Sequence, residues 1–378
     1  EDPELTDLTQ RMDPSGKIRR DLVAQLDSLR FRNSALFEGG GESLRMDALL
    51  AKRRSSTTTR RGYLPKSLES GAQMLPDARW VLISVPGRYA AGVARQALRL
   101  GKNAFLYSDN VPVEQEAELK KAAAARGLVV MGPDCGTAII NGKPLCFANV
   151  IRPGPVGVVA ASGTGLQEVS SIISNEGGGI SQAIGTGGRD VKKEVGGISF
   201  IDGLKALAAD ESTKVIVLIS KPPDKAVLAR INDAVERIDK PVVRIFLGAK
   251  PGGPNDARTL EEAALKAVAL WQERDPGEVD VTLESRDAAI WDRTEELARR
   301  RTEDQRYVRA LMSGGTFAAE AQVIFSSLIA DIASNVPTAG AHRLSDPNMT
   351  AKNTVIPTKI MPDVRIRSPQ DGRRCEGP

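Results

Sequence analysis

The chain has 378 residues, enough for two or three domains, and its 41% hydrophobic and 26% charged residues are typical of a globular protein. The net charge of +4 is modest, and the short basic runs carry no interleaved aromatic residues, so we expect no nucleic-acid binding. The sequence contains no apolar run of about eighteen residues and no recognisable signal peptide, which predicts a cytoplasmic protein without membrane contact. Three cysteines without CxxC spacing and a single histidine, His342, argue against a metal site or a disulfide framework.

The first 64 residues are poorly typed, with a plausible helix around Lys17 to Leu29 and a linker at Lys52 to Gly62. From Ser67 onward, helices and strands alternate, which predicts a Rossmann-type domain over residues 65–150. Its expected helices are Ser67–Leu75, Ala90–Leu100 and Val113–Arg126, and its expected strands are Trp80–Val85, Asn103–Tyr107 and Leu128–Met131.

A second α/β domain is expected over residues 151–275, with its boundary at Asn149–Pro155, which contains Pro153-Gly154-Pro155. Its expected strands are Val156–Ala161, Gly179–Ile184, Val215–Ser220 and Val242–Leu247, and its expected helices are Leu166–Glu176, Phe200–Ala209, Lys225–Ile238 and Thr259–Trp271. Residues 276–378 are predicted to form an incomplete third α/β domain with an irregular tail after Asn335. Its expected elements are the helix Glu295–Gln305, the strand Tyr307–Met312 and the helix Phe317–Ile329.

The most informative candidate for a functional site is the turn Ser162–Gly165, which joins the first expected strand of the second domain to the following helix. In an open α/β sheet, ligands bind at the carboxyl ends of the strands, and the backbone N–H groups of a helix N-terminus attract anions. Four strand ends carry polar residues on one edge, which predicts an anion site formed by Ser162, Gly163, Thr164, Gly165, Gly185, Thr186, Gly187 and Gly188. Arg189 and Lys221 are its expected catalytic cations, and Gly248-Ala249-Lys250 ends the fourth strand.

Two further turns are candidate contributors to the site. Asp134, Cys135 and Gly136 follow a strand, and we expect Cys135 to have a structural or binding role because no base for a nucleophile is nearby. Ser313, Gly314, Gly315 and Thr316 repeat the strand–Ser-Gly–helix arrangement. The Ser162–Gly165 turn is neither a Walker A loop nor a nucleophile elbow, because the Gly-Lys-Ser/Thr and Gly-x-Ser-x-Gly patterns are missing.

Five runs between about Lys66 and Lys250 are distinctive: Met131–Gly142, Ala161–Glu168, Ala183–Asp190, Glu194–Ile198 and Ile219–Pro223. Together they resemble the FdrA family, a relative of the α subunit of succinyl-CoA synthetase in the NDP-forming acyl-CoA synthetase superfamily. The resemblance implies a CoA-binding-like Rossmann domain followed by a flavodoxin-like ligase domain. In the synthetases, the helix matching Leu166–Glu176 faces a phosphate carried on a histidine. The corresponding stretch here, Leu247–Pro254, contains no histidine.

The resemblance therefore implies an enzyme that handles a free acyl or carbamoyl phosphate, in the setting of an oxamate (oxalurate) carbamoyltransferase of nitrogen catabolism. The alternatives are a subunit of an NDP-forming acyl-CoA synthetase and a non-catalytic CoA-sensing scaffold. By resemblance, CoA and ATP or ADP are candidate cofactors. The expected partners are a small anionic substrate, such as an oxamate-like acid, and the other subunits of a hetero-oligomer.

Overall fold

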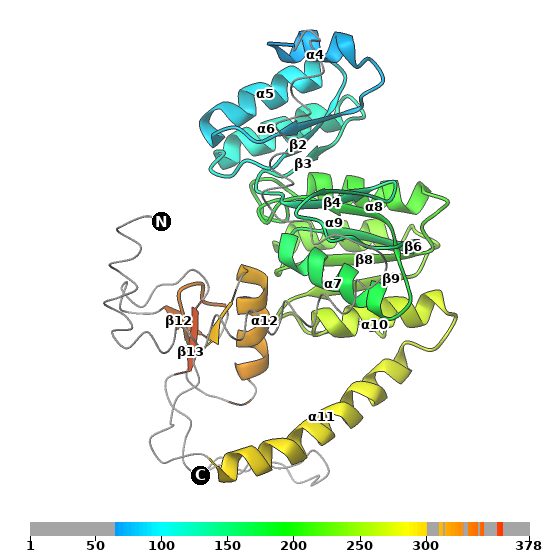
Figure 1. Ribbon diagram of the computed structural model, residues 1–378, viewed down its shortest axis with the longest axis vertical. Coiled ribbons are helices and arrows are strands. Elements are labelled where there is room, and N and C mark those ends of the chain that lie inside the picture. Colours follow the sequence, from blue (N-terminus) through cyan, green and yellow to red (C-terminus); the bar gives the residue numbers. More distant parts are fainter. Residues whose placement is uncertain are drawn as a thin grey trace, which may run out of the picture. The chain divides into compact units, whose positions relative to one another are not determined.

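The computed structural model describes residues 65–300, 310–312, 314–326, 328, 332–338, 341–343 and 354–357. Its first sheet has three parallel strands in the order β1-β2-β3 and confirms the α/β alternation expected from Ser67 onward (Figure 1). Alanines on α5 and apolar residues of β2 form its core, because small side chains allow the helix to pack closely on the strands. The elements are α4 (Leu68–Met74), β1 (Trp80–Ile83), α5 (Gly87–Arg99), β2 (Asn103–Leu106), α6 (Val113–Ala124) and β3 (Val130–Met131).

The second sheet has six strands in the order β5-β4-β7-β6-β8-β9. Four of these strands run parallel to one another, as predicted: β7, β6, β8 and β9, with β6 between β7 and β8. The elements are β6 (Pro153–Ala160), α7 (Gly163–Asn175), β7 (Ile180–Gly185), α8 (Ile198–Ala209), β8 (Val215–Ser220), α9 (Lys225–Val235), β9 (Val242–Phe246) and α10 (Leu260–Trp271).

Strand β8 shows why this sheet is covered on both faces. Every one of its residues is buried, and the side chains alternate between two apolar clusters. Val215, Val217 and Ile219 join the cluster under α7 and α10, whereas Ile216 and Leu218 join the cluster under α8 and α9. A continuous apolar run is what a strand with helices on both sides requires.

The hairpin at the edge of the second sheet was not expected from the sequence. Strands β4 (Thr137–Ile140) and β5 (Lys143–Cys146) pair antiparallel, and β4 also pairs antiparallel with β7 at Ile139 and Ala183. The turn between them is Asn141-Gly142, with φ of 49° and 69°, and two residues with positive φ are what a tight type I′ turn requires. An Asn-Gly pair between apolar strands is the sequence signal that predicts such a hairpin.

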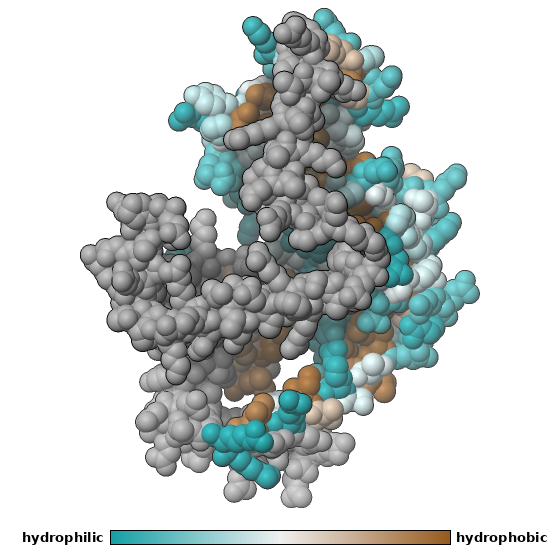
Figure 2. Space-filling view, viewed as in Figure 1, coloured by the Kyte–Doolittle hydropathy of each residue, from teal (hydrophilic) through white to brown (hydrophobic). Residues whose placement is uncertain are grey.

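Beyond α10 the chain forms a long helix and a small mixed sheet. Helix α11 (Gly277–Arg299) begins well before the helix expected at Glu295. The sequence analysis missed its first part because the apolar residues there are too sparse to show a clear helical period. Figure 2 shows hydrophobic residues among hydrophilic ones along it, and Val281, Ile290 and Leu297 are exposed. The small sheet, in the order β10-β13-β11-β12, is packed by α12. Its elements are β10 (Ala310–Leu311), α12 (Gly315–Ser326), β11 (Ile332–Ser334), β12 (His342–Arg343) and β13 (Thr354–Pro357).

Two strands of this small sheet, β12 and β13, fall in the tail that was expected to be irregular. They are two and four residues long, too short to produce a recognisable alternation in the sequence. The expectations for residues 1–64, including the helix around Lys17 and the linker at Lys52, lie outside the described residues.

Candidate functional site

The carboxyl end of β6 is a topological switch point of the second sheet. The connection that follows β6 runs through α7 on one face, and the connection that follows neighbouring β8 runs through α9 on the other face. Such a divergence opens a crevice between the two strand ends, which is where open α/β sheets bind ligands. The Ser162–Gly165 turn follows β6 and Lys221 follows β8, whose carboxyl ends are neighbours in the sheet, so both lie at this edge.

Ser162 is the N-cap of α7. Its backbone is extended, with φ of −156° and ψ of 112°, and its Oγ accepts a hydrogen bond of 3.0 Å from the Gly165 N–H. The carbonyl of Ser162 accepts the N–H of Leu166 at 3.0 Å. Since a helix cannot satisfy its first N–H groups internally, those of Gly163 and Thr164 remain directed out of the helix end, where an anion could accept them.

The two glycines of this turn serve different purposes. A Cβ on Gly165 would lie 2.8 Å from Ser162 Oγ and 3.0 Å from Ile219 Cγ2, so this glycine is required by packing against β8. A Cβ on Gly163 would meet only Thr137 Oγ1, at 3.8 Å, and Gly163 is exposed. Protein packing therefore does not require glycine at 163, and the space beside it is large enough for an oxygen of a bound anion.

The N-terminus of α12 meets the N-terminus of α7. Thr316 Oγ1 lies 2.5 Å from Ser162 Oγ, and a Cβ on Gly314 would lie 2.5 Å from Thr164 Cγ2. The sequence expectation that the Gly314-Gly315-Thr316 turn contributes to the site is consistent with this contact, while Ser313 lies outside the described residues. Two helix N-termini therefore converge at one place, and their partial positive charges add.

Glu320 holds α12 against the start of α10. Its Oε1 accepts the N–H of Leu260, the first residue of α10, at 2.7 Å. Burial raises the pKa of the Glu320 carboxyl, and Glu168 and Glu261 add to that effect, while the hydrogen bond from Leu260 opposes it. Ala319 joins the apolar core beneath α7 and α10, so α12 is anchored by both apolar and polar contacts.

Two glycines of the Gly185–Gly188 loop pack against the turn that contains Pro133 and Cys135. A Cβ on Gly185 would lie 2.4 Å from Cys135 Sγ, and one on Gly187, whose φ is +83°, would lie 2.4 Å from the Pro133 carbonyl. Thr186 is fully buried, and its N–H donates to the Ala160 carbonyl at 2.8 Å. Gly188 is exposed near the Ala161 carbonyl, so it is the residue of this loop with room for a ligand.

The Asp134-Cys135-Gly136 turn lies beneath that loop. Cys135 is buried, its Sγ is 3.2 Å from the Gly185 carbonyl, and burial raises the pKa of its thiol to about 12. A thiol with such a pKa is protonated at neutral pH and is a poor nucleophile. Asp134 adopts φ of +56° and donates its N–H to the Ser108 carbonyl, and Gly136 packs against the ring of Phe147.

The two candidate cations differ in their surroundings. Arg189 forms an ion pair of 2.9 Å with buried Glu116 and donates to the Val111 carbonyl at 2.8 Å, so its guanidinium is committed to α6 and the segment before it. Lys221 is exposed, directly after β8. Its pKa is lowered, first by loss of hydration and then by Lys192, and an anion placed between these two cations would relieve their repulsion.

Thr137, the first residue of β4, lies in the candidate site and was missed by sequence reasoning. Its hydroxyl lies beside Gly163, and it accepts a hydrogen bond of 3.0 Å from Gln167 Nε2 on α7. The Asn141-Gly142 turn could have revealed the hairpin. Its pairing with the second sheet, and hence the position of Thr137, depends on tertiary contacts.

His342 lies in β12, exposed, and pairs with Ala333 of β11. No group of His, Cys, Asp and Glu suited to a metal ion occurs among the residues that the structure describes. None of the described helices has the length and apolar character needed to cross a membrane.

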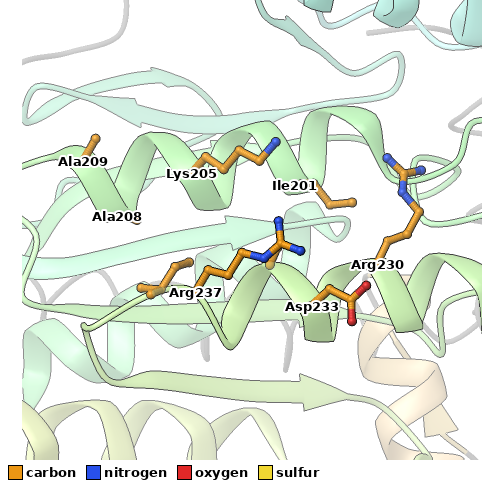
Figure 3. A pocket seen from close by; sticks show the side chains of 9 residues that line it. Ile201, Lys205, Ala208, Ala209, Arg230, Asp233 and Arg237 are labelled. Atoms are coloured by element: carbon orange, nitrogen blue, oxygen red, sulfur yellow. The ribbon is translucent and has the colours of Figure 1, made fainter.

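A cavity of about 460 Å³ lies away from these residues, between α8 and α9. Figure 3 shows Lys205, Arg230 and Arg237 on its rim with Asp233, over the apolar side chain of Ile201. Arg230 also donates to the Gly196 carbonyl at 2.6 Å. None of the predicted site residues lines this cavity.

Comparison with known proteins gives a consistent picture of the central part of the chain. Residues 151–248, which hold the β6–β9 region and the Ser162 turn, match the CoA binding domain family. The chain is 42% identical over 297 residues to YahF of Escherichia coli K12, covering 77% of this chain and 56% of YahF. It is 29% identical over 184 residues to the succinate–CoA ligase (ADP-forming) subunit alpha 2 of Archaeoglobus fulgidus, covering 47% of this chain and 62% of that protein.

Two solved structures match part of the chain. The dinucleotide-forming acetyl-coenzyme A synthetase 1 of Ca. Korarchaeum cryptofilum matches with a TM-score of 0.42 and 21% identity, over 50% of this chain and 48% of that one. The ATP citrate lyase of Methanothrix soehngenii matches with a TM-score of 0.43 and 19% identity, over 54% and 37%. The chain spans 56% of the length of YahF and 62% of the archaeal ligase subunit. By these comparisons the chain contains a CoA binding domain match and is similar in sequence to the α subunits of succinate–CoA ligases.

Proposed function

We propose that this chain is the phosphate-handling, α-subunit-like part of an enzyme related to the NDP-forming acyl-CoA synthetases. The observation that carries the proposal is the 2.5 Å contact between Ser162 and Thr316, which joins two helix N-termini at the switch point of the sheet. Similarity to the α subunits of ADP-forming succinate–CoA ligases supports the same class of chemistry.

In this proposal the anion is a phosphate or an acyl phosphate. The N–H groups of Gly163 and Thr164 bind its oxygens, and the hydroxyls of Thr164 and Thr316 add donors. Lys221 supplies the positive charge that stabilises the phosphate as it leaves or arrives. CoA and ATP or ADP are proposed as further ligands because residues 151–248 match the CoA binding domain. The remaining parts of the active site come from other subunits of a cytoplasmic hetero-oligomer.

A second candidate follows from the stretch after β9. Residues Leu247 to Pro254 contain no histidine, so a phosphohistidine cannot form there. An enzyme of the FdrA type would instead transfer the acyl or carbamoyl group of a free phosphate compound to an oxamate-like acid, as nitrogen catabolism requires. This reaction needs the phosphate site and the close positioning of two small anions, and no phosphate carrier on the protein.

Titration calorimetry of the full chain with phosphate, carbamoyl phosphate, CoA and ATP tests the proposal. Gly163→Val should lower the affinity for phosphate by at least roughly tenfold, because the added methyl groups occupy the space of the anion while meeting no backbone. Gly92→Val is the matched control, because Gly92 lies on α5 with nothing within 4 Å of its Cβ position. It should leave phosphate binding unchanged.

The outcomes separate the candidates. Formation of acyl-CoA from CoA, ATP and a carboxylic acid, with candidate partner subunits present, supports the ligase. Phosphorolysis of oxalurate under the same conditions supports the carbamoyl-transfer candidate. Binding of CoA without any response to phosphate or carbamoyl phosphate would contradict the phosphate site itself.

A further inference from the structure

Gln167 links the β4–β5 hairpin to the anion site. From the second turn of α7, its Nε2 donates to Thr137 Oγ1 at 3.0 Å and to the Phe147 carbonyl at 2.9 Å. Thr137 is 1% exposed, and its Oγ1 lies 3.8 Å from where a Cβ on Gly163 would stand. The segment that carries Phe147 is therefore held at a fixed position beside the helix end that would bind the anion.

The ring of Phe147 is fixed but uncovered. It meets Tyr107 edge-on, with ring centroids 5.3 Å apart and planes at 70°. Its Cδ2 lies 3.2 Å from where a Cβ on Gly136 would stand, so glycine at 136 is what allows the ring to lie so close to the backbone. The Phe147 N–H also donates to the Gly136 carbonyl at 2.8 Å. Even so, Phe147 is 63% exposed.

An isolated exposed apolar residue is common on protein surfaces and by itself has no meaning. Phe147 differs because both of its backbone hydrogen-bonding groups are engaged and its ring already contacts Tyr107, so the ring has less freedom to lose when a ligand covers its exposed surface. A rigid aromatic surface next to an anion site suits a ligand with a charged end and an apolar end.

We propose that Phe147 forms the wall against which the organic part of the substrate packs while its phosphate is bound at the N-terminus of α7. This inference rests on the proposed function and adds the substrate class: acyl groups with an aliphatic or aromatic chain. Phe147 is then a specificity-determining residue. Gln167 is a positioning residue, because it holds both Thr137 and the Phe147 backbone.

A series of alkylphosphonates tests the wall, because these compounds carry an anionic phosphoryl group like that of an acyl phosphate and are stable in water. In calorimetry with the full chain, propylphosphonate should bind roughly fifteenfold more tightly than methylphosphonate, given that each of its two additional methylenes contributes about fourfold when buried. Phe147→Ala should reduce this ratio to roughly twofold or less, and Phe147→Leu should retain part of it. Gln167→Leu should also reduce the ratio by freeing the backbone of Phe147.

Val150→Ala is the control, because Val150 is an apolar residue of the same region that is 96% exposed. The ratio should not change in this variant. An equal ratio in wild type and Phe147→Ala overturns the inference, and so does a loss of affinity in Phe147→Ala that is seen with CoA and not with the phosphonates. If the wild type still binds inorganic phosphate, either of these results rejects only the role of Phe147 and leaves the proposed function intact. If the wild type does not bind phosphate, the role of Phe147 and the proposed function are both rejected.

Discussion

At the scale of single residues, two cysteines of the same hairpin region have opposite environments. Cys135 is buried under Gly185, and burial raises the pKa of its thiol to about 12, whereas Cys146 at the end of β5 is exposed. Burial also raises the pKa of Cys146. Reactivity of a thiol depends on the thiolate fraction and on access; burial of Cys135 limits both at that residue, whereas Cys146 is accessible.

We therefore expect iodoacetamide at pH 8 to modify Cys146 well before Cys135. The thiolate of Cys135 is then only about one part in ten thousand of that residue, as its pKa of about 12 implies. Peptide mapping by mass spectrometry after timed alkylation of the native protein measures both sites. Unfolding in urea should abolish the difference, and rapid modification of native Cys135 would show that the site is more open than its packing indicates.

At the scale of elements, we expect a glycine-to-alanine substitution to change the free energy of unfolding in opposite directions in α5 and α7. Gly92→Ala in α5 should stabilise the protein by about 0.5–1 kcal/mol, because the position is open and alanine is the better helix former. Gly165→Ala in α7 should cost about 1–3 kcal/mol, because its Cβ would crowd Ser162 Oγ and Ile219 Cγ2.

Urea denaturation followed by circular dichroism measures both free energies of unfolding. A destabilising Gly92→Ala would show an unrecognised contact on α5. A neutral Gly165→Ala would show that α7 can move away from β8, and it would weaken the case for a fixed anion site.

The elements themselves were largely predictable. Strands and helices have different periods of hydrophobic residues, about 2 and about 3.6 residues. Strands β1 to β3 and β6 to β9 were therefore expected near their observed positions. The β4–β5 hairpin and α11 were missed because a four-residue strand and a sparse apolar pattern give a weak periodic signal. In the candidate site, Ser162 and Thr164 were expected, whereas Thr137 and Gln167 were not.

At the scale of the whole molecule, a buried network of charges joins the first sheet to the second. Lys120 of α6 lies 2.9 Å from Glu116 and 2.7 Å from Asp190, with all three side chains fully buried, and donates to the Thr186 carbonyl at 2.8 Å. Asp190 in turn accepts the N–H of Phe200 at 2.8 Å, at the start of α8. The network fixes α6 against the loop that carries the Gly185–Gly188 residues.

Lys120→Met should lower the free energy of unfolding by about 3–5 kcal/mol, because it leaves two buried carboxylates without their shared cation. Lys121→Met is the matched control, since Lys121 is the neighbouring and exposed residue of the same helix, and its effect should stay within about 0.5 kcal/mol. Urea denaturation measures both. Equal stability of the two variants would show that the network is replaceable by apolar packing.

The sequence by itself determined the parallel α/β class and the strand–turn–helix at Ser162–Gly165, because strand period, helix period and cap chemistry are local properties. Only the tertiary structure decided which residues share the site. It brought Thr316 to Ser162 across 154 positions of sequence, placed Thr137 beside Gly163, and committed Arg189 to Glu116. Those outcomes depend on which helix ends and strand ends pack together, and a local pattern carries no information about such distant contacts.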